Sequence, residues 1–283
     1  MNIELIAVDL DGTTLRTDKS VSERTAKALA EAAARGIRVV PATGRVAKML
    51  PRAVREIPGV RYAVTSNGAS VLDLDERSAL YENPMPRGAS ERIVRFFLAK
   101  GYLTEAYCGG LSYANAEAFP KLLERKLPEE IYDYIRESQI FVEDLPAFLR
   151  ERGFRLEKVN IPFVPAGEME PLRRAVLAMK GYAVTRSGRV NLEVGDASAN
   201  KGDGLRHLCE RLGVGPDRVM AIGDQENDVE MLRFAGLGVA MGNAARAALD
   251  AADAVTASND GDGVALAVER YALDGAPART ARL

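Results

Sequence analysis

Carboxylates placed close together in a chain can hold a divalent cation, and this sequence has two such pairs. Asp9 and Asp11 are two positions apart, and in extended backbone their side chains would point the same way, roughly 6–7 Å apart. Asp224 and Asp228 form the second pair. Carboxylates this close repel one another unless a cation or a proton accompanies them. An all-oxygen set suits Mg²⁺, and Lys201 could balance the excess negative charge or hold a phosphoryl oxygen.

Polar residues also follow four short apolar runs that have the length and composition of buried strands. These are Asp9 at the end of residues 3–9, Thr43 after 37–41, Asn67 after 62–65 and Asp224 after 218–222. In an open parallel sheet, ligands bind beyond the carboxyl ends of the strands. Each residue alone could be a helix cap or a turn residue, because Asp and Thr are preferred at caps. Four of them at one edge favour a binding site.

Helices alternate with these strands at both ends of the sequence. A helix is expected over about 22–35, where Ser20 and Glu23 have the spacing of a capping box and Gly36 is a stop signal. Further helices are expected from about residue 46 to 56 and at 199–212, 225–235 and 263–271, and further strands at 190–194, 237–241 and 254–256. This alternation predicts an α/β fold with a doubly wound, parallel, Rossmann-like sheet covered on both faces.

The pattern changes between about residues 84 and 188, where helices are longer and more charged and prolines are frequent. Helices are expected near 88–100, 143–152 and 167–179, and strands near 102–107, 154–161 and 181–186. We therefore expect residues 84–188 to form an α/β domain inserted into a core domain of residues 1–83 and 189–283, with 187–189 as the return linker. The tail from residue 274 is expected to be disordered.

Four sequence motifs, in order, resemble those of the haloacid dehalogenase (HAD) superfamily. They are DLDGTTL at 9–15, TGR at 43–45, KG at 201–202 and GDQENDVEM at 223–231. The run VAMGNA at 239–244 is similar to the Cof-type phosphatases of this superfamily, whose large α/β cap is inserted between the second and third motifs. The resemblance covers nearly the whole chain, but the cap is matched only by its size and position.

The resemblance implies a phosphatase and gives each matching residue a role. Asp9 would be the nucleophile that attacks phosphorus to give an aspartyl-phosphate, and Asp11 the general acid and base. Thr43 and Lys201 would hold phosphoryl oxygens. Substrate contacts are expected from Gly44, Arg45, Asn67, Asn200 and Asn227. Because dehalogenating relatives lack the second acid, Asp11 disfavours halide displacement.

The cofactor implied by the resemblance is Mg²⁺. Asp9, the backbone carbonyl of Asp11 and Asp224 would bind the ion, and Asp228 would support it and its waters. A magnesium ion would neutralise phosphoryl oxygens and align the reactants.

Composition is that of an ordinary globular protein without a strongly charged partner. The 283 residues are 47% hydrophobic and 28% charged, and 38 basic against 40 acidic residues give a net charge of −2. Neither nucleic acid nor a membrane is therefore expected as a partner. The start of the chain lacks the basic region of a secretory signal, and only two cysteines, Cys108 and Cys209, are present. A cytoplasmic location is expected.

Three functions remain open at this point. The first is a magnesium-dependent phosphatase acting on a small soluble phosphomonoester, with a sugar phosphate favoured. The second is a phosphomutase that hands the phosphoryl group to another hydroxyl of a hexose phosphate. The third is a catalytically idle module that binds a phosphometabolite, although a binder has no use for the Asp9–Asp11 pair. The substrate and the oligomeric state are not readable from the sequence.

Overall fold

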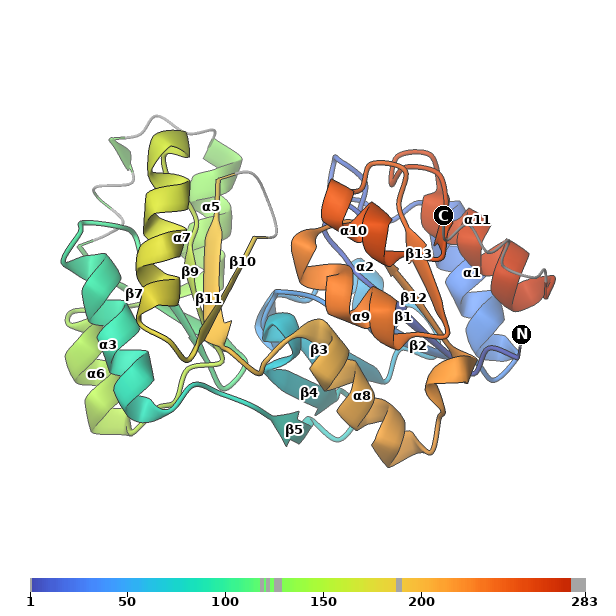
Figure 1. Ribbon diagram of the computed structural model, residues 1–283, viewed down its shortest axis with the longest axis horizontal. Coiled ribbons are helices and arrows are strands. Elements are labelled where there is room, and N and C mark those ends of the chain that lie inside the picture. Colours follow the sequence, from blue (N-terminus) through green and yellow to red (C-terminus); the bar gives the residue numbers. More distant parts are fainter. Residues whose placement is uncertain (1, 118–119, 121–122, 125–128, 187–189, 276–283) are drawn as a thin grey trace. The chain divides into compact units, whose positions relative to one another are not determined.

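A five-stranded parallel sheet brings the two ends of the chain together (Figure 1). Its strands, in spatial order, are β14 (Ala254–Val255), β13 (Leu237–Ala240), β12 (Val219–Gly223), β1 (Leu5–Val8) and β2 (Arg38–Pro41). Val8 of β1 lies beside Ile222 of β12 and beside Pro41 of β2. The strands are short, almost continuous apolar runs, as expected where both faces of a sheet are covered. The predicted parallel α/β core is confirmed.

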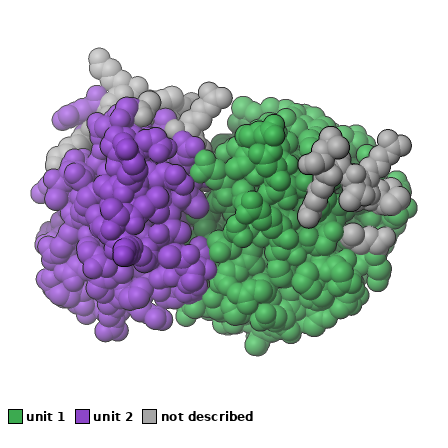
Figure 2. Space-filling model, in the orientation of Figure 1, with its two compact units in different colours: residues 1–45, 50–82, 200–283 green, residues 46–49, 83–199 purple. Residues whose placement is uncertain are grey.

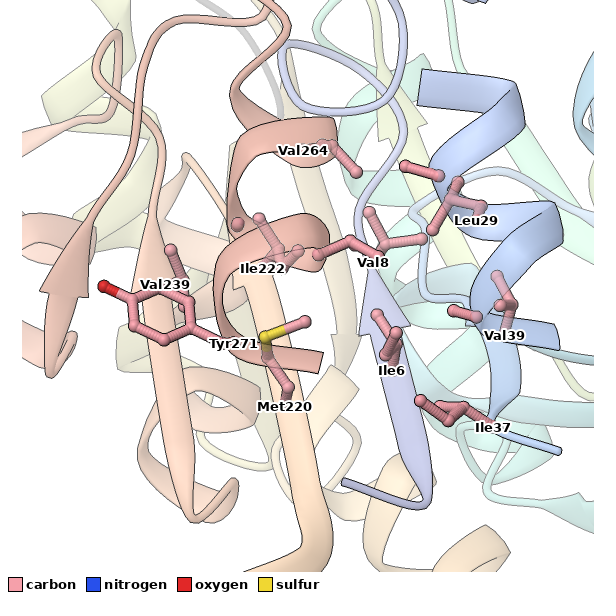
Figure 3. Close-up of a cluster of buried hydrophobic side chains, with 14 of the residues drawn as sticks. Ile6, Val8, Leu29, Ile37, Val39, Met220, Ile222, Val239, Val264 and Tyr271 are labelled. Atoms are coloured by element: carbon pink, nitrogen blue, oxygen red, sulfur yellow. The ribbon is translucent and has the colours of Figure 1, made fainter. Parts of the chain in front are cut away.

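Helices cover both faces of this sheet (Figure 1). On one face lie α1 (Glu23–Ala34) and α11 (Gly263–Ala267), which continues as a π-helical segment over Val268–Leu273; on the other lie α8 (Lys201–Leu212), α9 (Val229–Phe234) and α10 (Arg246–Ala251). Successive residues of a strand point to opposite faces. Val8 therefore packs with Leu29 and Val264 (Figure 3), whereas its neighbour Ala7 packs with Leu205 in a separate core.

The start of α1 differs from the expectation. Ser22, not Ser20, is the N-cap, and its side chain accepts a hydrogen bond from the backbone N–H of Thr25 at 3.0 Å. Ser20 instead hydrogen-bonds to Asp18 in the preceding turn. The capping box expected from Ser20 and Glu23 was therefore wrong, because a serine two residues closer to the helix takes the same role.

The segment after β2 is also less regular than expected. In place of one helix to residue 56, the chain forms a short 3₁₀ turn, Ala47–Met49, and a single helical turn, α2 (Arg52–Arg55). Pro51 separates them, since proline disfavours the helical conformation in the residue before it.

Residues 62–65 do form a strand, but in a different sheet from the expected one. β3 (Tyr62–Thr65) pairs antiparallel with β4 (Ser70–Asp73), which pairs with β5 (Ser78–Glu82). β3 meets β2 only through an isolated parallel bridge between Ala42 and Val64. The buried apolar pattern identified the strand, but the hairpin turn after it decided its partner.

The structure, a computed structural model, describes residues 2–275, except 118–119, 121–122, 125–128 and 187–189. The chain divides into two compact units (Figure 2): unit 1 holds residues 1–45, 50–82 and 200–283, and unit 2 holds 46–49 and 83–199. The return linker expected at 187–189 and most of the C-terminal tail fall outside the described residues. The domain boundaries inferred from the sequence stay a prediction.

Unit 2 contains a six-stranded sheet in the order β10-β11-β9-β6-β7-β8. The strands are β6 (Glu105–Cys108), β7 (Leu111–Asn115), β8 (Gln139–Val142), β9 (Lys158–Ile161), β10 (Tyr182–Thr185) and β11 (Leu192–Asp196). Helices α3 (Arg87–Leu98), α6 (Leu145–Arg152) and α7 (Met169–Ala178) share an apolar core with it, and α5 (Glu129–Ser138) precedes β8. The sequence did not predict β7, α5 and β8.

One further strand was assigned to the wrong sheet. The strand expected at 190–194 as part of the parallel core is β11, which pairs antiparallel with β10 and β9 in unit 2. Its alternation of Leu192, Glu193 and Val194 fits a sheet with one apolar and one polar face. Among the described residues, none of the helices has both the length and the apolar composition needed to cross a membrane.

Candidate active site

Two acidic residues follow directly on neighbouring strands of the parallel sheet. Asp9 comes after β1 and Asp224 after β12, and both are buried. The backbone N–H of Asp9 donates to the carbonyl of Ile222 at 2.9 Å, so the hydrogen bonding between β1 and β12 continues one residue beyond β1, to Asp9. The Asp9 carbonyl in turn accepts hydrogen bonds from the hydroxyl and the N–H of Thr14. The strand ends thus fix the backbone on which the acids stand.

Lys201 connects the two acidic pairs. Its side chain is 0% exposed, and Nζ lies 2.5 Å from Oδ1 of Asp9 and 2.6 Å from Oδ1 of Asp228. Lys201 is the first residue of α8, and its position depends on a close backbone approach: Gly68 has a φ of +90°, and a Cβ there would lie 1.9 Å from the carbonyl oxygen of Asn200. The turn at 66–68 therefore has room for the start of α8 only because residue 68 is glycine.

Asp228 is held rigidly from its other side. Its Oδ2 accepts hydrogen bonds from the backbone N–H groups of Asp224 and Gln225, both at 2.9 Å. Gly223 is needed for this packing, because a Cβ there would come within 2.5 Å of the Asp228 carboxyl carbon. With both oxygens hydrogen-bonded, Asp228 has one orientation only.

Asp224 is oriented by neighbours from two loops. Oδ1 accepts a hydrogen bond from the hydroxyl of Thr13 at 3.0 Å, and Oδ2 accepts one from Nε2 of Gln225 at 2.9 Å. Gly12, which has a φ of +86°, presses its backbone against this carboxylate: a Cβ there would lie 2.5 Å from Oδ2. The loop after β1 and the loop after β12 are thus packed directly on each other.

Burial and mutual repulsion act on the charges of this cluster. Burial raises the pKa of Asp9 well above its ordinary value; Lys201 opposes this, and the carboxylates of Asp228 and Asp224 add to it. Burial and Asp228 raise the pKa of Asp224 to about 6, against the hydrogen bonds from Gln225 and Thr13. Burial alone would lower the pKa of Lys201, but Asp228 and Asp9 raise it instead.

These residues fit a hard metal cation. One carboxylate oxygen from each of Asp9, Asp224 and Asp228 lies within 4.8 Å of the others. Three carboxylates against the single ammonium of Lys201 leave excess negative charge in a buried place, which a divalent cation would neutralise. The donors are oxygens only, the set that Mg²⁺ prefers over softer metals.

Asp11 does not belong to this cluster through its side chain. Its carboxylate forms a two-pronged ion pair with Arg45, with Nε at 2.7 Å and Nη2 at 2.8 Å, and Lys19 approaches at 3.1 Å. Burial would raise the pKa of Asp11, but the bonds from Arg45 and the charge of Lys19 outweigh it and hold the pKa well below its usual range. The chain turns after β1, so Asp9 and Asp11 face different cations, unlike the extended pair expected from their spacing.

Thr43 and two of the expected substrate contacts meet at another part of the sheet edge. Thr43 is buried, its hydroxyl accepts the backbone N–H of Arg45 at 3.1 Å, and its carbonyl accepts the N–H of Asn67 at 3.0 Å. Asn67, with left-handed backbone at a φ of +55°, accepts a hydrogen bond from Nδ2 of Asn227 at 3.0 Å. Residues that follow β2, β3 and β12 are therefore joined. Thr43 and Asn67 do lie close together as their positions after strands predicted, although β3 belongs to the three-stranded sheet and not to the parallel one.

The remaining expected contacts have other surroundings. Asn200 caps α8: its side chain accepts the N–H of Asp203 at 2.8 Å, which explains its place before Lys201 without a ligand. Arg45 pairs with Asp11, and Gly44 lies in the bend between Thr43 and Arg45.

Three features of the site had no clear signal in the sequence. Lys19 is a lysine in a turn. Thr13, within the DLDGTTL motif, suits acid–base chemistry on a phosphate ester, but its bond to Asp224 was not predicted, and Asn243 lies in the VAMGNA run, for which no role was predicted. Asn243 donates a hydrogen bond to the carbonyl of Gly12 at 2.9 Å. The contacts of Thr13 and Asn243 join segments far apart in the chain, for which spacing gives no information.

Comparison with known proteins agrees with this geometry. A family model described as haloacid dehalogenase-like hydrolase matches residues 6–268. The 5-amino-6-(5-phospho-D-ribitylamino)uracil phosphatase YcsE of Bacillus subtilis is 30% identical over 277 residues, covering 96% of this chain and 97% of the relative. The phosphatase YwpJ of the same organism is 31% identical and covers 93% and 98%.

A solved structure is similar over the same extent. A haloacid dehalogenase-like hydrolase from B. subtilis superposes with a TM-score of 0.81 at 25% identity, covering 94% of this chain and 99% of that one. The similarity to these proteins therefore includes both units and is not confined to the parallel sheet.

Proposed function

This chain belongs to the haloacid dehalogenase-like hydrolases and is a phosphatase, and we propose that it hydrolyses small phosphomonoesters with the help of Mg²⁺ through an aspartyl-phosphate on Asp9. The observation that carries this proposal is the position of Lys201 between Asp9 and Asp228, beside Asp224. A buried lysine among three carboxylates suits the binding of a phosphoryl group and a cation. These residues belong to the sequence motifs that follow the strand ends.

Asp9 is the proposed nucleophile. Lys201 takes Oδ1, so Oδ2 is the oxygen that attacks phosphorus. The bond from Oδ2 to phosphorus forms as the bond to the leaving-group oxygen breaks, and water then cleaves the acyl phosphate to restore the carboxylate. The ammonium of Lys201 also stabilises negative charge on the phosphoryl oxygens during the transfer.

Asp11 is proposed to move the protons. The ion pair with Arg45 keeps its carboxylate ionised, the form that accepts a proton from water in the second half of the reaction. In the first half it must donate a proton to the leaving alkoxide, so Arg45 has to release it when substrate arrives. Arg45 then becomes available to contact the substrate, which is the role predicted for it.

The cation is proposed to be Mg²⁺, held by Asp9, Asp224 and the backbone carbonyl of Asp11, with Asp228 fixing the neighbouring groups. When bound, the ion supplies positive charge that neutralises the phosphoryl oxygens. Thr43 and the paired amides of Asn67 and Asn227 supply further polar groups at this edge. Gly44 and Asn200 are proposed to act on substrate binding through the backbone: Gly44 in the bend between Thr43 and Arg45, and Asn200 as the N-cap that places Lys201.

A sugar phosphate or a similar phosphometabolite is the proposed substrate class. The name of the relative YcsE specifies a phosphate on a ribityl chain, which is a sugar-alcohol ester. The near-neutral net charge gives no reason to expect a polyanionic partner.

The test is hydrolysis of p-nitrophenyl phosphate and of a panel of sugar phosphates by the purified protein. We expect free phosphate to be released in the presence of Mg²⁺ and not after EDTA treatment. Asp9→Asn should lower kcat by at least about 1,000-fold, because a carboxamide is a poor nucleophile. Asp250→Asn, which changes an exposed aspartate paired with Arg246, is the matched control and should leave the rate unchanged.

Four results would contradict the proposal. Activity that survives Asp9→Asn or ignores EDTA would remove the mechanism. A hexose phosphate converted to an isomer without release of phosphate would identify a phosphomutase instead, and tight ester binding without turnover across the panel would identify a binding module.

A further inference from the structure

The turn after β13 contacts both loops that carry the acidic cluster. Nδ2 of Asn243 donates to the carbonyl oxygen of Gly12 at 2.9 Å, and the backbone N–H of Ala245, two residues on, donates to the carbonyl oxygen of Asp224 at 2.8 Å. One short segment is therefore bonded to the loop after β1 and to the loop after β12. Asn243 belongs to the VAMGNA run at 239–244, and Ala245 follows it directly; the proposed chemistry uses no residue of this run.

The amide of Asn243 has only one orientation consistent with its partners. Its Oδ1 accepts the backbone N–H of Asn259 at 2.9 Å, so the other end, Nδ2, must face the carbonyl of Gly12. Asn259 donates in turn from Nδ2 to the carbonyl of Leu15 at 3.0 Å. The two asparagines form a relay that holds the loop after β1 at two points from outside.

This relay holds the part of the loop after β1, Gly12 and Thr13, that contacts Asp224. Gly12 lies so close to Asp224 that a Cβ would be 2.5 Å from Oδ2, and the next residue, Thr13, donates to Oδ1 at 3.0 Å. If the Gly12–Thr13 peptide moved outward, Asp224 would lose both its packing partner and its hydrogen bond. The two carboxylate-bearing loops would then no longer be held at one spacing.

We propose that the turn at 243–245, through the side chain of Asn243 and the N–H of Ala245, is a positioning element that sets the spacing of the two loops for cation binding. The inference rests on the proposed function, since it assigns the cation to Asp9 and Asp224. Asn243 touches none of the acidic side chains and acts through Gly12. Partners of metal ligands commonly change metal affinity by about 10- to 100-fold when they are removed.

The test is calorimetric titration of the metal-free full-length protein with MgCl₂, alongside kcat and KM for p-nitrophenyl phosphate. We expect Asn243→Ala to raise the Kd for Mg²⁺ by about 10- to 100-fold and the lost activity to return at high Mg²⁺, with KM for the ester little changed. Asn243→Asp keeps the acceptor for Asn259 but loses the donor to Gly12, so it should also raise the Kd for Mg²⁺. This second variant keeps the test valid if the alanine variant folds poorly.

Thr17→Ala is the matched control. It removes the hydroxyl hydrogen bond from Thr17 to Asp260, which joins the loop after β1 to the segment that contains Asn259 but lies away from Gly12, and it leaves the backbone bond to Asp260 in place. We expect it to leave the Kd for Mg²⁺ unchanged. Asn259→Ala should have a smaller effect than Asn243→Ala, because the backbone N–H of residue 259 still reaches Asn243.

The outcomes separate this inference from the function on which it rests. If the wild-type protein binds Mg²⁺ and both Asn243 variants bind it equally well, the inference is overturned but the proposed function is not. A loss of affinity that Thr17→Ala reproduces overturns the inference too, since the effect would then be general loosening of the loops. Wild-type protein that neither binds Mg²⁺ nor releases phosphate overturns the proposed function and the inference together.

Discussion

Two buried lysines, one in each unit, both form short ion pairs with buried carboxylates but have different surroundings. Lys201 in unit 1 lies 2.5 Å from Asp9 and 2.6 Å from Asp228. Lys158 on β9 of unit 2 lies 2.7 Å from Glu193, and both side chains are at most 5% exposed. Lys158 also lies over the ring of Tyr107, 4.8 Å from its centroid. Burial of an ion pair is costly in either place.

The difference lies in what each lysine is joined to. Lys201 lies where three strand ends and a helix start converge, and its two partners belong to the cluster of three acids that is proposed to hold a cation. Lys158 lies on β9, which pairs antiparallel with β6 and β11, and Glu105 and Asn160 are among its polar neighbours. The opposite face of these strands carries apolar side chains. A buried charge is thus not evidence of a catalytic site by itself, whereas convergence of several chain segments on one group is.

Among changes that test the comparison of the two lysines, the largest effect is expected for Lys201→Met. Removing the ammonium leaves Asp9 and Asp228 buried without their counter-charge, so we expect kcat to fall by at least about 100-fold and the metal-free protein to lose about 3–5 kcal/mol of stability. Phosphate release and urea unfolding measure the two effects. A variant that keeps its rate would remove the distinction between the two lysines.

Lys158→Met should separate stability from chemistry. It leaves Glu193 and Glu105 buried, so a loss of about 3–5 kcal/mol in the free energy of unfolding is expected here as well. Turnover of p-nitrophenyl phosphate per folded molecule should be unchanged, because the partners of Lys158, Glu193 and the ring of Tyr107, belong to unit 2 and not to the acidic cluster of unit 1. A lower rate in the fully folded variant would show that the polar face of unit 2 takes part in catalysis.

The pH dependence of stability and of Mg²⁺ affinity should further distinguish the surroundings of Lys201 from those of Lys158. The pKa of Asp224, about 6, is raised from an ordinary value of 3.8, so the folded protein binds the proton more tightly than the unfolded chain. The free energy of unfolding of metal-free protein should therefore fall as pH rises from about 4 to about 6, and Mg²⁺ affinity should rise over the same window. Unfolding curves and Mg²⁺ titrations at about pH 5 and about pH 7 measure both trends, and Mg²⁺ binding that is equal at the two values would contradict the expectation.

The smallest effect is expected for Glu105→Gln. Burial raises the pKa of Glu105, against hydrogen bonds from Asn160 and Tyr107, so its ionisation destabilises the folded state as pH rises above the ordinary value. The amide oxygen of glutamine can still accept both hydrogen bonds. We expect a slight gain in unfolding free energy at neutral pH, no gain at acid pH and no change in phosphatase rate. A loss of stability at neutral pH would show that the ionised carboxylate is needed to balance Lys158.

Local pattern alone was enough to locate most of the strands and the residues that follow them. The run at 62–65 was predicted with the bounds that β3 has, and Asp9 and Asp224 do follow directly on buried strands. Which sheet a strand joins was a different matter: β3 and β11 were both assigned to the parallel core and belong elsewhere. Pairing depends on hydrogen bonds between distant segments, and an apolar run is equally compatible with several partners.

The sequence by itself determined the family, the α/β core and the set of acids that the chemistry needs, because motifs and apolar periodicity are local properties of the chain. Only the tertiary structure decided that Asp11 turns away to Arg45, that Lys201 lies between Asp9 and Asp228, and that Asn243 bonds to Gly12. Side-chain direction after a strand end, and contacts across more than a hundred residues, are set by packing against other segments, which residue spacing does not record.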